Sequence, residues 1–142
     1  SKEVVRTGDR SKMKVIIVSG GRSYANRDLV RSTLDNLLEQ YGHISITHGG
    51  CNCKPGEEGI GADFFANEWA EDREILSVPH FAAWEEYGRS AGPIRNNKMI
   101  ESAKDMWNAP AMLVAFPGGP GTKNAIAVAK KHGLDIMEIK DE

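Results

Sequence analysis

The chain contains 142 residues, 40% of them hydrophobic and 27% charged, which suits one globular domain built on a single sheet covered by helices. The formal net charge of −2 argues against a general affinity for nucleic acid or anionic membranes, because such binding needs an excess of Lys and Arg. No apolar run reaches the roughly 20 residues of a membrane span, and no signal-peptide core is evident, so we expect a cytoplasmic protein that does not bind membranes.

Residues 1–12 are polar and without periodicity, so we expect a flexible N-terminal arm before a single domain that spans residues 13–142. Apolar runs of strand length recur along that domain. The predicted strands are 14–19, 44–48, 74–79, 111–116 and 135–139.

Segments with helical spacing of apolar residues separate these strands. The predicted helices are 27–41, closed by Gly42, then 61–70, 93–106 and 124–132. Strands that alternate with helices predict an α/β fold, a doubly wound parallel sheet of about five strands with helices on both faces. In such a sheet all the strand-to-helix loops emerge at one edge.

Three of these loops are rich in glycine. The most pronounced, Pro117-Gly118-Gly119-Pro120-Gly121-Thr122, precedes the last helix. Its glycines permit positive φ and leave backbone N–H groups uncovered, so an anion can approach them at the positive end of that helix. A tight turn without a ligand is the simpler interpretation of one such loop, but the recurrence at Gly20-Gly21 and Gly49-Gly50 favours a phosphate-binding edge.

The converging loops also carry side chains that suit a phosphorylated ligand with a sugar and a base. Arginine binds phosphate, a carboxylate binds a sugar hydroxyl, and an aromatic ring stacks on a base. The predicted ligand-binding residues are Gly20, Gly21, Arg22, Ser23, Gly49, Gly50, Asp63, Trp84, Arg95, Asn96, Gly118, Gly119, Gly121 and Thr122. Tyr24 is an alternative stacking residue, and a helix-capping role for Asp63 is an equal alternative.

Other polar residues have plainer interpretations. Arg95 is expected in the first turn of its helix, where a cation opposes the dipole, and such conflicts are typical of functional positions. His48 fits a strand-end residue better than a catalytic base. Cys51 and Cys53 are too few for a disulfide framework or a four-ligand zinc site, so we expect free thiols, no metal and no cofactor.

Several segments carry a resemblance to a known family. They are Val18-Ser19-Gly20-Gly21-Arg22, Gly61-Ala62-Asp63, Trp84 with Tyr87-Gly88, Ala91-Gly92-Pro93-Ile94-Arg95-Asn96 with Met99, and Gly121-Thr122. Together they resemble the YspA, or YpsA-related, branch of the SLOG superfamily, over roughly residues 13–139 in the same order. This resemblance implies a Rossmann-like domain that binds a nucleotide-derived ligand, with relatives in phages and bacteria.

The glycine-rich loop is also similar to the first six positions of the PGGxGTxxE motif of the LOG family, and Arg95 resembles the upstream arginine of that family. LOG proteins are dimers that cleave the N-glycosidic bond of cytokinin riboside monophosphates. The position of the motif glutamate is Ala125 here, and alanine cannot stabilise an oxocarbenium-like centre or assist the attack of water. Either Asp63, Glu85 or Glu86 replaces it, or the protein only binds its ligand.

The sequence therefore favours a sensor or binding module for a phosphorylated nucleoside or nucleotide-derived ligand. The alternative is a hydrolase or transferase acting on the N-glycosidic bond, with Asp63 and Arg95 as candidate catalytic residues. A third hypothesis is an interaction protein that binds a partner through residues 51–60. Met106, Trp107 and Met112 suggest an exposed apolar surface and a homodimer, whereas nucleic acid is not an expected partner.

Overall fold

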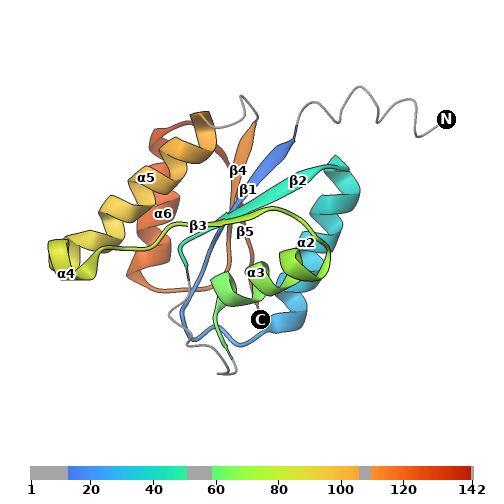
Figure 1. Cartoon of the computed structure of the whole chain (residues 1–142), viewed down its shortest axis with the longest axis horizontal. Coiled ribbons are helices and arrows are strands. Elements are labelled where there is room, and N and C mark those ends of the chain that lie inside the picture. Colours follow the sequence, from blue (N-terminus) through green and yellow to red (C-terminus); the bar gives the residue numbers. More distant parts are fainter. Residues whose placement is uncertain (1–12, 51–58, 106–109, 142) are drawn as a thin grey trace.

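The structure is a computed structural model that describes residues 13–50, 59–105 and 110–141 (Figure 1). Strands and helices alternate along these residues. The elements are β1 (Lys14–Ser19), α2 (Arg27–Tyr41), β2 (Ile44–His48), α3 (Ala62–Asp72), β3 (Ser77–Pro79), α4 (Trp84–Tyr87), a 3-10 turn (Gly88–Ser90), α5 (Ala91–Asp105), β4 (Ala111–Ala115), α6 (Pro120–Lys131) and β5 (Asp135–Glu138). The arm predicted for residues 1–12 lies outside the described residues, as do Cys51, Cys53 and Trp107.

The five strands form one parallel sheet in the order β3-β2-β1-β4-β5. Helices α2 and α3 cover one face, and α5 and α6 cover the other (Figure 1). This arrangement confirms the predicted doubly wound, Rossmann-like α/β fold. The strand order reverses between β1 and β4, and in open α/β sheets ligands bind at the carboxyl ends of the strands beside such a reversal.

The central strand β1 explains why the core has two halves. Its residues are apolar at successive positions, as a strand buried on both faces requires. Ile16 and Val18 pack in the cluster under α2 and α3, whereas Val15 and Ile17 pack in the cluster under α5 and α6. Trp69 is a core residue that packs in the first cluster at 0% exposure.

Three elements begin at least two residues away from their predicted starts. The third strand begins at Ser77 instead of residue 74, because the chain must first turn out of α3 and Glu74 adopts a φ of 56°. Helices α5 and α6 begin earlier than predicted, at Ala91 and Pro120. As a result Arg95 is the fifth residue of α5 and lies in its second turn, not its first.

The prediction that Met112 contributes to an exposed apolar surface is wrong. Met112 lies in β4 at 4% exposure, because its side chain packs in the core under α2 and α3. It therefore gives no support to the predicted homodimer. Among the described residues, no helix is both long enough and apolar enough to cross a membrane.

Candidate functional site

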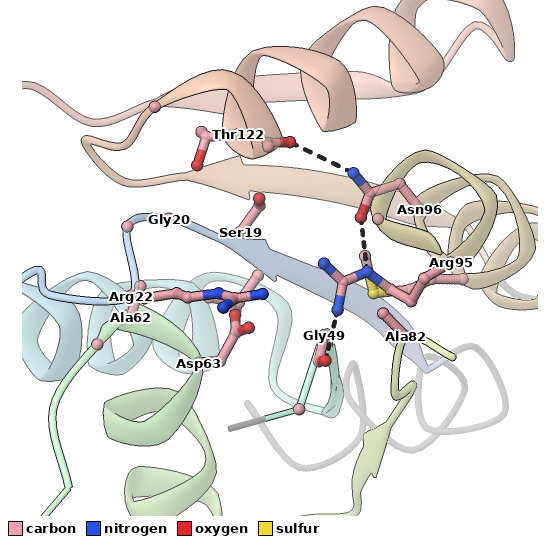
Figure 2. Close-up of a pocket in the computed structure, with 18 of the residues that line it drawn as sticks. Ser19, Gly20, Arg22, Gly49, Ala62, Asp63, Ala82, Arg95, Asn96 and Thr122 are labelled. Carbon is pink, nitrogen blue, oxygen red and sulfur yellow. Dashed lines mark hydrogen bonds between the residues drawn. The ribbon is translucent and has the colours of Figure 1, made fainter. Parts of the chain in front are cut away.

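A cavity of about 550 Å³ opens at the carboxyl ends of the strands (Figure 2). Its size falls within the range typical of small-molecule sites. The predicted ligand-binding residues that line it are Gly20, Gly21, Arg22, Gly49, Gly50, Asp63, Trp84, Arg95, Asn96, Gly119, Gly121 and Thr122. Ser23 and Gly118 do not line the cavity. The structure thus brings most of the predicted set together from loops far apart in sequence.

One wall of the cavity is the start of α6. Pro120 is the first helical residue and has no N–H, and no described side chain caps the helix, so the N–H groups of Gly121 and Thr122 have no partner within it. A Cβ placed on Gly119 or Gly121 would have no other residue within 4 Å, so neither glycine is required by packing. Their lack of side chains instead leaves open space beside the amides.

Other glycines are required by close packing or by backbone conformation. A Cβ on Gly20 would lie 2.5 Å from the Cβ of Ala62, and one on Gly118 would lie 2.7 Å from the backbone nitrogen of Gly21. Gly61 has a φ of 112°. The glycines of the loop before α6 do not adopt positive φ, so the freedom predicted for them is not used.

Arg95 is fixed within the cavity wall by hydrogen bonds to two other segments. Its Nη1 donates to the carbonyl of Gly49 and, at 3.4 Å, to that of His80. Its Nε donates at 2.9 Å to Oδ1 of Asn96 (Figure 2). The half-buried guanidinium is therefore held in one orientation on the cavity side of α5.

Asn96 links Arg95 to the start of α6. Its Nδ2 donates to Oδ1 of Asn124 at 2.9 Å and to the carbonyl of Gly121 at 3.3 Å. Asn96 is buried, and its side-chain oxygen and nitrogen both bond to protein groups. Its role is therefore to connect Arg95 to the start of α6. Its partner Asn124 was not predicted, because only the fold brings these two amides together across 28 positions of sequence.

Asp63 lies at the beginning of α3 and does not cap that helix, because the Gly61 cap has no side-chain hydrogen bond. The backbone N–H of Gly49 donates to the Asp63 carboxylate, while its Oδ1 is out of contact with solvent and has no partner among the described residues. Burial raises the pKa of Asp63 from 3.8 to about 7, against the opposing effects of Arg95, the Gly49 N–H and Arg22. A carboxyl of this kind in a cavity is typical of functional sites.

The mouth of the cavity is apolar and aromatic. The guanidinium carbon of Arg22 lies 5.1 Å from the ring centroid of Trp84, which is 41% exposed. Ile60 and Phe81 also line the cavity and are exposed, Phe81 at 66%. They were not predicted, although an aromatic residue just after a strand, as at Phe81, was an available signal. We call Ile60, Phe81 and Trp84 the apolar rim.

Two other predicted aromatic and polar candidates lie elsewhere. Tyr24 is not part of the cavity lining, because its ring packs near Phe116 and its hydroxyl donates to Asp141 at 2.8 Å. His48 is a buried strand-end residue. The Gly50 N–H donates to its Nδ1, so its Nε2 carries the proton toward Asn67, and burial lowers the pKa of His48.

The three carboxylates that could replace the missing glutamate differ in their position relative to the cavity. Ala125 is 0% exposed and packs in the core under α5 and α6, so its position faces the sheet instead of the cavity. Glu85 and Glu86 are exposed on α4 and do not line the cavity. Among the described residues, Asp63 is the carboxylate that lines it.

Comparison with known sequences now identifies the family. The family described as "YspA, cpYpsA-related SLOG family" matches residues 14–87, about half of the chain. The chain belongs to this SLOG family. A curated relative, the Gene 61 protein of Mycobacterium phage D29, is 29% identical over 139 residues, which cover 92% of this chain and 99% of the phage protein. The family match includes the loops after β1 and β2 and the start of α3, whereas Arg95 and the loop before α6 lie beyond it.

Proposed function

We propose that this SLOG protein binds a phosphorylated nucleoside or nucleotide-derived ligand, as a sensor or binding module. The observation that carries the proposal is the start of α6, where uncapped amides and the open space at Gly119 and Gly121 face a cavity that also contains Arg95. The positive end of a helix and a fixed guanidinium both favour a phosphate at this position. SLOG membership supports a nucleotide-related ligand.

The apolar rim supports the nucleoside part of the proposal. Phe81 and Trp84 offer aromatic surface on which a base can stack, and Arg22 lies over the Trp84 ring. An inorganic anion alone would leave this surface without a function. The cavity therefore suits a ligand that is anionic at one end and planar at the other.

The proposal is tested by thermal shift against nucleoside monophosphates, NAD, ADP-ribose and cyclic nucleotides. A ligand that binds only the native state raises the melting temperature, and the shift grows with the logarithm of the ligand concentration once that concentration exceeds Kd. Stabilisation by at least one member is expected. A panel in which no compound stabilises the protein would contradict the proposal.

A second measurement assigns the binding to Arg95. We predict that Arg95→Ala weakens the affinity for the stabilising ligand about 10-fold to 100-fold, the usual effect of losing a hydrogen bond to a charged group. Arg89→Ala is the matched control, because Arg89 is exposed near the start of α5 and does not line the cavity. Equal affinity of the two variants would place the ligand elsewhere.

One observation favours a second candidate function, cleavage or transfer at the N-glycosidic bond. Asp63 is a buried carboxyl whose Oδ1 lacks a partner and whose pKa of about 7 suits proton transfer near neutral pH. Incubation with AMP and NAD, followed by chromatography for the free base, tests it. Confirmed binding with no base released would reject this candidate. Full turnover by Asp63→Asn would show instead that Asp63 is not the catalytic acid.

A further inference from the structure

Above about pH 7, where it is ionised, Asp63 supplies a feature of the cavity that an anion cannot satisfy. The carboxylate already accepts a hydrogen bond from the Gly49 N–H, and since Oδ1 has no partner among the described residues, the bonded atom is Oδ2. A buried oxygen without a partner is costly, and such atoms in native proteins call for an explanation. A hydrogen-bond donor on the bound ligand would supply this partner.

The surroundings of Asp63 restrict that donor to a neutral group. The guanidinium groups of Arg22 and Arg95 both act on the carboxylate, so a further cation would be repelled by two neighbouring charges. A paired donor, such as the edge of a base with two adjacent N–H groups, needs both carboxylate oxygens, and one is already engaged with Gly49. A single hydroxyl fits the single oxygen that is left.

The position of Asp63 across the cavity from the start of α6 limits which hydroxyl this is. Figure 2 shows Asp63 and Thr122 on opposite walls, with Ser19 and Gly20 at the end of β1 between them. The amides at the start of α6 would bind the phosphate, and the apolar rim would contact the base. The part of a nucleotide that joins these two groups is the sugar.

Resting on the proposed function, we infer that the cavity selects ribonucleotides over their 2′-deoxy counterparts, with Asp63 Oδ1 accepting a hydrogen bond from the 2′-hydroxyl of the ribose. Asp63 is then a specificity-determining residue. Free phosphate and deoxyribonucleotides leave Oδ1 without a partner, and both bind more weakly for that reason.

Isothermal titration of the full chain with matched ribo- and 2′-deoxyribonucleoside 5′-monophosphates tests this inference. The ribo form is expected to bind about 10-fold or more tightly, the effect of one hydrogen bond to a charged group. In Asp63→Ala the two sugars should bind alike, because the ribose hydroxyl has lost its acceptor. Glu85→Ala, which removes an exposed carboxylate outside the cavity, should keep the wild-type preference.

The remaining outcomes distinguish a failure of this inference from a failure of the proposed function. Equal binding of both sugars by the wild-type protein overturns the inference while leaving the nucleotide site in place, and this comparison needs no variant to fold. A sugar preference that survives in Asp63→Ala, or a variant that changes base preference instead, overturns the role of Asp63. Failure of every nucleotide to bind overturns the proposed function together with the inference.

Discussion

The protonation of the Asp63 carboxyl in the cavity affects the stability of the folded protein. The pKa of Asp63 is about 7 in the folded protein, above the ordinary 3.8. Between these two pH values the native protein therefore keeps a proton that the unfolded chain has lost. The resulting stabilisation is complete below about pH 4 and is lost as the pH rises to about 7. We predict that Asp63→Asn raises the free energy of unfolding near pH 8 by up to about 4 kcal/mol, with little change near pH 4.

Denaturant unfolding at both pH values checks this prediction, with Glu85→Gln as an exposed control. An amide oxygen can still accept the hydrogen bond from the Gly49 N–H, so the substitution mainly removes the buried charge. A variant less stable than the wild type near pH 8 would contradict it. The buried charge would then be a stabilising feature, not one retained for a ligand.

Substitution of Gly121 is expected to affect ligand binding and protein stability in opposite directions. It lies in the first turn of α6 without a positive φ, and alanine in a helix is more favourable than glycine by about 0.5–1 kcal/mol. We predict that Gly121→Ala keeps or raises the melting temperature of the unliganded protein but weakens ligand binding at least about 10-fold, because its Cβ enters the space beside the amides. Lys123→Ala, exposed and outside the cavity lining, is the control for thermal shift and titration. Unchanged affinity in Gly121→Ala would argue against an anion at this helix.

At the scale of elements, α5 and α6 are joined beside the cavity by a single buried amide. Asn96 accepts from Arg95 and donates to Asn124 and to the Gly121 carbonyl. We predict that Asn96→Ala lowers the free energy of unfolding by about 1–3 kcal/mol, because it leaves these partners unsatisfied. Asn97→Ala should change it by less than about 0.5 kcal/mol, since Asn97 is only partly buried and its side chain bonds only to Pro93 of its own helix in the described structure. Equal effects in urea unfolding would contradict a linking role for Asn96.

The elements that were predicted correctly carry their signals within their own sequence. β1 is a continuous apolar run, and α2 has the predicted bounds because Gly42 closes it with a φ of 78°. The start of α6 could not be placed from its sequence, because Pro120, Gly121 and Thr122 are equally compatible with a loop. Likewise the glycines at 20 and 118 were predicted as ligand contacts, but part of their role is close packing against Ala62 and Gly21, which only the fold reveals.

At the scale of the molecule, the cavity depends on the strand order. The loops after β1 and β4 meet because these strands are neighbours with helices leaving on opposite faces. The alternation of strands and helices was sufficient to predict that the glycine-rich loops share one edge. It could not indicate how the polar atoms are used there, since Arg95 binds the Gly49 carbonyl and Asp63 binds the Gly49 N–H only once the sheet is formed.

The total charge of the cavity follows from that assembly and changes with pH. Asp63, which lies near the guanidinium groups of Arg22 and Arg95, loses its proton near pH 7. His48 and His80 lie near Arg95, and burial lowers the pKa of both, which favours their neutral forms. We predict that sulfate, a dianion with no proton to donate, binds several-fold more tightly near pH 6 than near pH 8, because ionised Asp63 opposes it.

Melting temperatures measured against sulfate concentration at each pH check this prediction. Sulfate also stabilises proteins by exclusion from their surface, and that general effect is common to Gly121→Ala, so the difference between the wild type and this variant isolates binding at α6. In Asp63→Asn the pH dependence should weaken, because the carboxyl that opposes the anion is removed from the cavity lining. Tighter binding near pH 8 in the wild type would mean that Asp63 does not face the bound anion, and the cavity would have to be occupied in another orientation.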